Sequence, residues 1–289
     1  MSSATTASAV LRTARPRQWI KNLLVLAAPL AAGVLLDADV LPRVLAAVGL
    51  MILASSSIYL INDVADAEAD RNHPTKQSRP VASGQLSPTV AVAAAVVLSA
   101  SSLAGSFALS SDLGIVVTVY LALQVGYVLG LKHEPVLDLA VVSSGFLLRA
   151  IAGGVAADVP LSQWFLIVAA FGSLYMVAGK RYSELQMLGA GAHTRRSLLL
   201  YSDSFLRFVW GTAAGITITA YCLWAFEMAP PEGVAWQTIS IAPFVIAMLR
   251  YGADIDRGAA GEPEEVVLHD RVLLGLAALW LGTFALGLS

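Results

Sequence analysis

The feature that most constrains the fold is a series of apolar segments, each near the length that crosses a lipid bilayer. A membrane-spanning helix needs about 20 mostly apolar residues, and a helix satisfies all its backbone polar groups internally within lipid. The nine segments expected to span the membrane are 22–36, 43–61, 88–109, 113–131, 136–155, 162–180, 203–225, 236–251 and 271–288. The sequence therefore predicts an all-α, polytopic membrane protein, a bundle of nine transmembrane helices.

Composition supports this class. Hydrophobic residues make up 57% of the 289-residue chain and charged residues 13%, whereas a soluble domain is about 25% charged. Residues 1–14 are rich in Ser, Ala and Thr and are expected to form a mobile tail, followed by a single transmembrane domain over 15–289. The only cysteine, Cys222, excludes an internal disulfide and is expected to pack inside a span.

The basic residues indicate how the chain is oriented. With nine spans and an inner N-terminus, all 18 Lys and Arg residues except Arg43, Arg149 and Arg207 fall in or beside the inner loops. The positive-inside rule then places the N-terminus in the cytoplasm, and the protein in the inner (plasma) membrane. The acidic residues that follow the second expected span lie on this inner side, so we expect the active site to face the cytoplasm.

An acidic block follows the second expected span, with the sequence Asn62-Asp63-Val64-Ala65-Asp66-Ala67-Glu68-Ala69-Asp70-Arg71. On a helix Asp63, Asp66 and Asp70 share one face, where like charges repel. A divalent cation would reverse this repulsion, and oxygen ligands favour Mg²⁺, which often bridges to phosphate. We predict that Asn62, Asp63, Asp66 and Asp70 form a metal site.

Cations directly after this block extend the prediction. Arg71, Lys76 and Arg79 follow within nine residues of Asp70, where they can bind the remaining oxygens of a phosphate. The whole block therefore indicates a Mg²⁺–diphosphate site at the membrane surface. A hydrated loop without a ligand would need neither carboxylates in helical phase nor a cation cluster after them.

Two further segments add candidates, one before the first expected span and one at the end of the fourth. The segment Arg15-Pro16-Arg17-Gln18-Trp19-Ile20-Lys21-Asn22 fits an interfacial anchor, or binds phosphate through Arg17, Lys21 and Asn22. Both interpretations stay open. Tyr127 and Lys132 close the fourth span, and Asp138 starts the fifth, at the same membrane level as the acidic block.

Arg149 lies inside the fifth expected span. An arginine within a membrane must pair with another group or face a watery cavity, which makes it a functional candidate. Asp138 is eleven residues away, or about 16 Å along a helix, so direct pairing within that helix is excluded. We expect Arg149 to face the central cavity and bind a phosphate or a carboxylate that organises the site.

A second charged cluster ends the sixth expected span, with the sequence Gly179-Lys180-Arg181-Tyr182-Ser183-Glu184. Glu184 is a candidate metal ligand, and Lys180 and Arg181 are candidate phosphate ligands. An ordinary positive-inside loop is the alternative. The acidic loop over 254–265 receives no assigned chemistry.

On these residues the chain resembles the UbiA superfamily of intramembrane prenyltransferases over about 15–288. The resemblance rests on Asn62-Asp63-x-x-Asp66-x-x-x-Asp70, on the run from Arg71 to Gly84, on Tyr127 and Lys132 before Asp138, and on Arg149 followed by Ala150 and Gly153. It implies a nine-helix bundle whose central cavity opens to the cytosol and laterally to lipid. It also implies a site for Mg²⁺ and a diphosphate beneath cytosolic caps.

One departure from the superfamily pattern narrows the expectation. Most members carry a second aspartate-rich motif after the sixth span, where this chain has Lys180-Arg181-Tyr182-Ser183-Glu184-Leu185. The chain therefore looks like a branch, found in actinobacteria that make arabinan, that uses phosphoribose diphosphate and decaprenyl phosphate. The resemblance implies transfer of a 5-phosphoribosyl group to the lipid phosphate, with diphosphate released, for synthesis of a cell-wall arabinogalactan precursor.

In this interpretation Asp66, Asp70, Lys132 and Arg149 are the catalytic candidates. The expected partners are phosphoribose diphosphate, a polyprenyl phosphate and the lipid bilayer; no nucleic acid is expected, and a homo-oligomer is left open. One alternative is a prenyl diphosphate donor that alkylates an aromatic acceptor in quinone synthesis, which a second acidic cluster would favour. Another is a membrane transporter, which would not release diphosphate.

Overall fold

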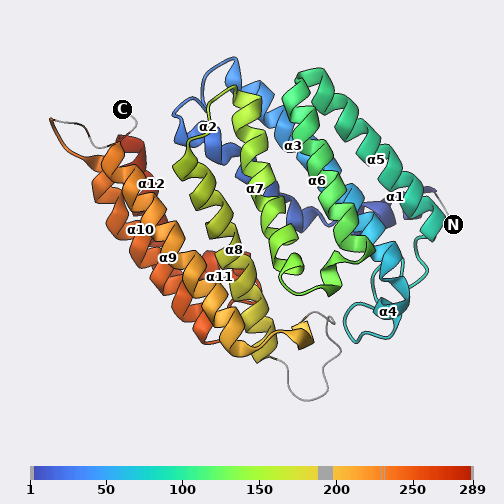
Figure 1. Cartoon of the computed structure of the whole chain (residues 1–289). Coiled ribbons are helices and arrows are strands. Elements are labelled where there is room, and N and C mark those ends of the chain that lie inside the picture. The colour runs from blue at the N-terminus through green and yellow to red at the C-terminus, as the bar shows by residue number, and fades with distance from the viewer. Residues whose placement is uncertain (1–2, 188–197, 229, 231, 288–289) are drawn as a thin grey trace. The chain divides into compact units, whose positions relative to one another are not determined.

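The computed structural model describes residues 3–187, 198–228, 230 and 232–287. Arg195 and Arg196, expected in an inner loop, lie outside these ranges. Within them every regular element is helical (Figure 1), which confirms the all-α prediction. The seven described helices that are long and apolar enough to cross a membrane are α3 (Val40–Ala65), α5 (Pro88–Leu109), α6 (Ser111–Leu129), α7 (Leu137–Ala157), α8 (Gln163–Gln186), α9 (Asp203–Glu227) and α10 (Trp236–Asp256).

The chain divides into two compact units, where the sequence predicts one domain over 15–289. The first unit comprises Met1–Lys132 and Leu148–Pro160, and the second comprises His133–Leu147 and Leu161–Ser289. The beginning of α7 therefore belongs to the second unit and its end to the first.

Helix α3 is the centre of the first unit. It packs against α5, α6, α1 (Ser3–Thr13) and the 3₁₀ helix η1 (Pro16–Leu26). Its buried side chains Val44 and Met51 join Leu113 and Val117 of α6 in one apolar cluster. The unit also contains the short helices α2 (Ala27–Ala31) and α4 (Ala67–Arg71), and η2 (Leu131–His133) begins at its edge.

The expected first span, 22–36, is not a regular transmembrane helix, so that prediction was wrong. The chain forms η1, then the five-residue helix α2, and then turns at Gly33, whose φ is 74°. Pro29 interrupts the pattern because proline lacks the N–H that a helix interior needs. An apolar run was therefore mistaken for a continuous helix.

This broken segment nevertheless runs the length of α3. Arg15, just before η1, pairs with Asp63 near the end of α3, whereas Asp39 directly precedes its first residue. The eleven residues of η1 span about 22 Å and the five of α2 about 8 Å, close to the thickness of a bilayer core of about 30 Å. Neither η1 nor α2 is among the seven described helices that are long and apolar enough to cross a membrane.

The N-terminal residues, expected to be a mobile tail, form helix α1. Ala9 of α1 is 1% exposed and packs with Leu60 of α3 and with Val81 and Leu86. Arg12 also donates a hydrogen bond to Gln85 Oε1 at 2.6 Å. Helix α1 therefore covers the loop that follows the acidic block.

The second unit is built from long helices, each of which packs against the next long helix along the chain. Helix α8 packs against α9, and α10 packs against α9 and α12 (Arg271–Leu286). Its core combines Tyr175 and Tyr182 of α8 with Leu206 of α9 and Ile255 of α10. The short elements are η3 (Leu198–Leu200) and α11 (Pro263–His269). At 16 residues α12 is shorter than the ninth expected span, 271–288, whose end lies outside the described residues.

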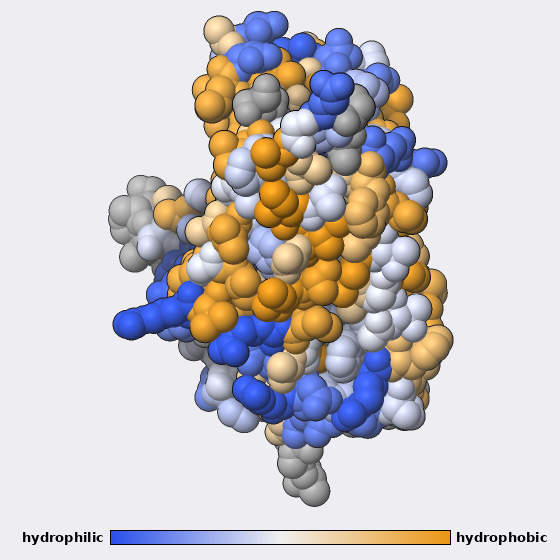
Figure 2. Space-filling view, turned by 90° about the vertical axis from the view of Figure 1, so that its left-hand side faces the viewer, coloured by the Kyte–Doolittle hydropathy of each residue, from blue (hydrophilic) through white to orange (hydrophobic). Residues whose placement is uncertain are grey.

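The surface agrees with a membrane environment. Large apolar side chains remain exposed on several long helices, among them Val97 of α5 at 63%, Phe208 of α9 at 66% and Leu249 of α10 at 63%. In the face shown in Figure 2, hydrophobic residues gather over the middle and hydrophilic residues gather towards the lower edge. Such an apolar surface is typical of helices that contact lipid.

Candidate active site

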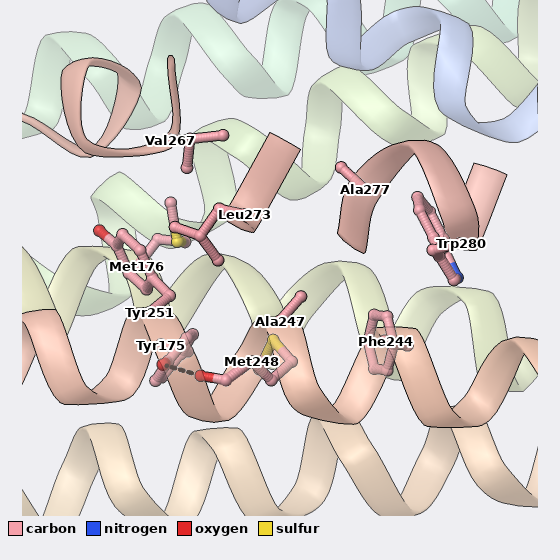
Figure 3. Close-up of a pocket in the computed structure, with 10 residues that line it drawn as sticks. All are labelled: Tyr175, Met176, Phe244, Ala247, Met248, Tyr251, Val267, Leu273, Ala277 and Trp280. Atoms are coloured by element: carbon pink, nitrogen blue, oxygen red, sulfur yellow. Dashed lines mark hydrogen bonds between the residues drawn. The ribbon is translucent and has the colours of Figure 1, made fainter. Parts of the chain in front are cut away.

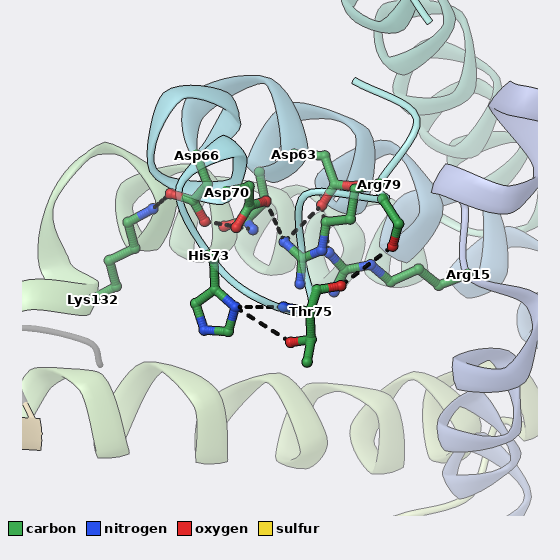
Figure 4. Close-up of polar contacts among 10 residues, drawn as sticks. Arg15, Asp63, Asp66, Asp70, His73, Thr75, Arg79 and Lys132 are labelled. Carbon is green, nitrogen blue, oxygen red and sulfur yellow. Dashed lines mark hydrogen bonds and ion pairs between the residues drawn. The ribbon is translucent and has the colours of Figure 1, made fainter. Parts of the chain in front are cut away.

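The acidic block forms where α3 ends. Asp66 ends α3 and begins α4, with φ −93° and ψ 0°. The backbone N–H of Asp70 still donates to Asp66 O at 2.8 Å, so the two residues lie one helical turn apart on one side. Figure 4 shows their carboxylates next to each other. The sequence prediction that Asp66 and Asp70 share a face is therefore confirmed.

Asp63 has a different environment, since its side chain is only 2% exposed. It accepts hydrogen bonds from the guanidinium groups of Arg15 and Arg79, the latter at 3.4 Å. The same Arg79 nitrogen, Nη1, donates to Asp70 Oδ2 at 2.7 Å (Figure 4). Asp63 therefore holds two cations, and this pairing differs from its predicted role as a metal ligand.

Arg15 is a site residue that the sequence reasoning passed over. Its guanidinium lies 5.0 Å from the centre of the Tyr59 ring, which gives a favourable cation–π interaction. Its backbone is left-handed, with φ 53° and ψ 66°, a conformation uncommon for residues other than glycine. The only sequence signal for Arg15 was its position two residues before the predicted candidate Arg17.

Asp66 is paired with the predicted residue Lys132. The Lys132 ammonium donates to Asp66 Oδ1, and Asn62 Nδ2 donates to Asp66 Oδ2 at 3.0 Å. The Lys132 side chain is 11% exposed and that of Asp66 is 32% exposed. Lys132 therefore lies at the acidic block, as its place at the end of the fourth span predicts.

The donor set of the acidic block suits a hard cation. Asn62, Asp66 and Asp70 offer only oxygen ligands, the kind that Mg²⁺ prefers. Among the described residues, no three His, Cys, Asp or Glu side chains are placed to bind one ion. Mg²⁺ is, however, usually held by one or two carboxylates together with substrate phosphates. Asp66, whose side chain is 32% exposed, is the accessible carboxylate of the block, with Asp70 beside it; Asp70 and Asp63 are both buried, and Asp63 is held by two arginines.

Arg149 lies in a buried polar cluster of the first unit. Its Nε donates to Asn22 Oδ1 at 2.8 Å, and its Nη2 donates to the Tyr120 hydroxyl at 3.0 Å. Asn22 Nδ2 in turn donates to Ser55 Oγ on α3 at 3.2 Å. The exposed fractions are 6% for Arg149 and 0% for Asn22. Arg149 and Asn22, predicted separately, thus belong to one hydrogen-bonded network.

The other predicted residues of the first unit lie around these clusters. Trp19, beside the candidates in η1, donates from Nε1 to Ser56 Oγ at 3.1 Å. Arg17 is exposed, Lys21 and Lys76 are half-buried, and Tyr127 is buried. In the loop that carries Lys76, the backbone N–H of Thr75 lies 3.3 Å from His73 Nδ1 (Figure 4).

The second unit contains the other charged cluster. Arg181 donates from Nε to Asp138 Oδ2 at 2.8 Å, from Nη2 to Asp138 Oδ1 at 3.2 Å and from Nη1 to Glu184 Oε2 at 2.9 Å. Arg181 is 4% exposed and Asp138 is 0% exposed. This buried, two-pronged pair differs from the predicted role of Arg181 as a phosphate ligand. Glu184, predicted as a metal ligand, accepts from Arg181.

Lys180, next to Arg181, has longer ion pairs. Its ammonium lies 3.9 Å from Glu184 Oε1 and 3.5 Å from Glu262 Oε1. Nearby, the backbone N–H of Val136 donates to the Tyr201 hydroxyl at 2.8 Å. Burial raises the pKa of the Tyr201 phenol above its usual range, mainly by desolvation. It therefore accepts this bond as a neutral group at pH 7.

An apolar cavity of about 210 Å³ lies in the second unit (Figure 3). Its wall includes Tyr175, Met248, Phe244 and Trp280. The Tyr175 hydroxyl donates to Met248 O at 2.8 Å. Such a lining suits hydrocarbon rather than phosphate. No residue of the charged clusters described above lines this cavity.

The comparison with protein families gives one match. The model of the UbiA prenyltransferase family matches residues 23–267. This range contains the acidic block, Lys132, Arg149 and Lys180.

Three curated relatives are similar over nearly the whole chain, and each is a decaprenyl-phosphate phosphoribosyltransferase. The protein of Mycolicibacterium smegmatis is 53% identical, covering 96% of this chain and 91% of the relative. That of Mycobacterium tuberculosis is 52% identical, with 95% and 92% covered. That of Corynebacterium glutamicum is 50% identical, with 95% and 85% covered.

Solved structures of low sequence identity share the fold. A UbiA homolog from Archaeoglobus fulgidus bound to GPP and Mg²⁺ has a TM-score of 0.72 at 16% identity, covering 96% of this chain and 98% of that chain. A digeranylgeranylglyceryl phosphate synthase structure has a TM-score of 0.69 at 17% identity, with 98% of both chains covered.

Proposed function

This chain belongs to the UbiA prenyltransferase family, and we propose that it transfers a 5-phosphoribosyl group from phosphoribose diphosphate to decaprenyl phosphate. The observation that carries the proposal is the identity of 50 to 53% with curated decaprenyl-phosphate phosphoribosyltransferases over at least 95% of the chain. Diphosphate is the second product. In the relatives' bacterial setting, the lipid product would feed synthesis of the cell-wall arabinogalactan.

The acidic block is the proposed site of the diphosphate. Asp66, Asp70 and Asn62 would hold Mg²⁺, in agreement with a family structure that contains Mg²⁺ and GPP. When bound, Mg²⁺ supplies Lewis-acid stabilisation to the negative charge that grows on the leaving diphosphate. Arg79 pairs with Asp70 and Lys132 with Asp66, while Arg15 pairs with the neighbouring Asp63; the remaining donors of these cations would bind phosphate oxygens.

The reaction needs little from a general base. The bond from ribose C1 to diphosphate breaks, and an oxygen of the lipid phosphate forms the new bond to C1. That oxygen is already anionic at pH 7, so its attack does not await removal of a proton. The cations around the acidic block stabilise the negative charge on the leaving group, which is electrostatic stabilisation by fixed donors.

Arg149 has a supporting part in this proposal. Its guanidinium is fixed by Asn22 and Tyr120, so its charge stays within the membrane-spanning part of the first unit. A fixed cation there attracts the phosphate head of the lipid acceptor.

The proposed site faces the cytoplasm. Arg12, Arg15 and Arg17 precede the expected first span, and Arg71, Lys76 and Arg79 follow α3. Under the positive-inside rule these two groups lie on the cytoplasmic side. Phosphoribose diphosphate would therefore enter from the cytoplasm.

The decisive experiment offers purified protein both chemistries in parallel. One reaction contains Mg²⁺, labelled phosphoribose diphosphate and decaprenyl phosphate; the other contains Mg²⁺, a prenyl diphosphate and an aromatic acid. We expect labelled lipid in the first reaction and no alkylated aromatic acid in the second. Label that stays in water, together with an alkylated aromatic acid in the second reaction, would replace our proposal with the quinone-type chemistry.

A further inference from the structure

The 3₁₀ helix η1 has separate inner and outer faces, because each turn of a 3₁₀ helix takes three residues. The inner face, which lies against α3, consists of Trp19, Asn22 and Val25. The outer face consists of Arg17, Ile20 and Leu23. Ile20 is 50% exposed and Leu23 is 49% exposed. The outer face therefore presents one cation followed by two large apolar side chains.

The contacts of η1 place Arg17 at the level where α3 ends. Arg15, just before η1, pairs with Asp63 in the last turn of α3 (Figure 4). Trp19 Nε1 donates to Ser56 Oγ at 3.1 Å, about two turns further inside α3. Arg17 lies between these two contacts, and the apolar residues of the outer face follow towards the middle of α3. A cation above apolar side chains is the arrangement that meets a phospholipid, with the charge at the head group and the apolar residues at the acyl chains.

Arg17 differs from the two arginines before it in having no partner within the described part of the chain. Arg12 donates to Gln85 Oε1 at 2.6 Å, and Arg15 donates to Asp63 Oδ1. The side chain of Arg17 is exposed, and no hydrogen bond or ion pair joins it to a residue that the structure describes. Its guanidinium is therefore available to an anion from outside the protein.

The length of η1 makes it depend on contacts at its faces. Runs of 3₁₀ helix longer than three or four residues are uncommon, because their hydrogen bonds have poorer geometry, whereas η1 has 11 residues. The inner face carries Asn22, whose Oδ1 accepts from Arg149 Nε at 2.8 Å. A ligand that fixes the outer face of η1 therefore also fixes Asn22 and, through it, Arg149.

We propose that the outer face of η1 binds an anionic phospholipid, with the Arg17 guanidinium at the lipid phosphate and with Ile20 and Leu23 against its acyl chains. An anionic head group is favoured over a zwitterionic one because no carboxylate neutralises Arg17. The bound lipid fixes η1, so transfer depends on the anionic lipid of the membrane. This dependence rests on the proposed function, whereas the lipid site does not.

The binding test measures the melting temperature of the full-length protein in neutral detergent as short-chain phosphatidylglycerol is added. A ligand that binds only the folded state raises this temperature. The wild type and Arg17→Lys should respond alike, whereas Arg17→Gln should need about fivefold more lipid, the effect of one cation near an anionic surface. Phosphatidylcholine and inorganic phosphate are the comparison probes. A response to either probe that depends on Arg17 as strongly would mean a site for neutral lipid or for a small anion and would overturn the inference.

Arg43→Gln is the matched control. Arg43 is exposed in the first turn of α3, at the other end of that helix, and its side chain also pairs with no residue that the structure describes. The control removes the same charge from the same unit without touching η1, and it should bind phosphatidylglycerol like the wild type. An equal loss in Arg43→Gln would show a general surface-charge effect and overturn the inference. So would an unchanged affinity in Arg17→Gln.

Transfer in reconstituted membranes separates this inference from the proposed function. The wild type and Arg17→Gln are placed in nanodiscs of phosphatidylcholine, alone or mixed with phosphatidylglycerol. The wild type should transfer faster in the mixture, and Arg17→Gln should lose most of this gain. Equal wild-type rates in the two membranes would overturn the dependence on lipid, and a raised KM for phosphoribose diphosphate in Arg17→Gln would make Arg17 a substrate ligand instead. A wild type without transfer in either membrane contradicts the proposed function alone, because the melting temperature reports lipid binding without it.

Discussion

At the scale of single residues, the three aspartates of the acidic block have different tasks. Asp66 and Asp70 lie one turn apart on one side of the chain, whereas Asp63 is buried between Arg15 and Arg79. Asp66→Ala and Asp70→Ala should abolish transfer at any Mg²⁺ concentration, because each removes a proposed metal ligand. The measurement is turnover against Mg²⁺, with circular dichroism to show that both variants remain folded.

Asp63→Asn should behave differently. It leaves two arginines without their shared charge, and a hydrogen bond to a charged group contributes about 1.5–3 kcal/mol. We expect the KM for phosphoribose diphosphate to rise about 10- to 100-fold, with the Mg²⁺ dependence unchanged. A requirement for much more Mg²⁺ in this variant would instead return Asp63 to the metal site.

Arg149 is the second residue whose role can be resolved by substitution. Arg149→Lys keeps the charge, but one ammonium on a flexible stem cannot reproduce the planar fork that reaches both Asn22 and Tyr120. The variant should insert and accumulate yet lose most of its activity. Asn22→Ala should cause a similar loss, and the double variant should be little worse than either, since the two residues act together. Additive losses would mean that they act separately.

The site residues that the sequence analysis missed or assigned to another role have one physical reason in common. Asn62 and Asp66 were predicted in one site from their spacing, and Lys132 was placed at the same membrane level by its position at the end of the fourth span. Arg15 was missed, and Asp63 was given another role, because the metal site was assigned from the spacing of the aspartates along one helix, whereas the structure pairs Asp63 with Arg15 of another segment. Spacing along one helix carries no information about such a contact.

At the scale of elements, the approach of η1 to α7 depends on one glycine. A Cβ at Gly153 would lie 1.7 Å from Val25 O in η1, so no side chain fits there. Alanine usually stabilises a helix relative to glycine by about 1 kcal/mol. Gly153→Ala should instead lower the melting temperature, because overpacking costs about 1–3 kcal/mol. The control is Gly275→Ala in α12, where nothing lies within 4 Å of the added Cβ. This change should not lower the melting temperature.

The same segment shows where prediction of the fold from sequence ends. The long apolar helices α3 and α5 to α10 were all predicted from their apolar runs, with ends shifted by a few residues. The expected first span was predicted as a regular helix, but the segment forms η1 and α2. Apolar content predicts that a segment lies in lipid, but it carries no information on whether the backbone forms a 3₁₀ or an α-helix.

At the scale of the whole molecule, the orientation in the membrane sets which compartment supplies the substrate. Helix α5 has 22 residues and is about 33 Å long, so the loops before and after it lie on opposite sides of a bilayer. The loop before it carries the cations Lys76 and Arg79, and the first turn of α6, directly after it, carries Asp112. The positive-inside rule therefore predicts that the first loop is cytoplasmic.

Cysteine labelling tests this orientation directly, because the chain has one cysteine, Cys222. In a Cys222→Ser background, exposed Ser78 and exposed Asp112 are each replaced by cysteine. A membrane-impermeant maleimide added to intact cells should label Asp112→Cys, whereas Ser78→Cys should be labelled only after the membrane is opened. The reverse pattern would place the acidic block outside the cell, away from cytoplasmic phosphoribose diphosphate. Both variants should retain transfer activity, since neither residue belongs to the proposed site.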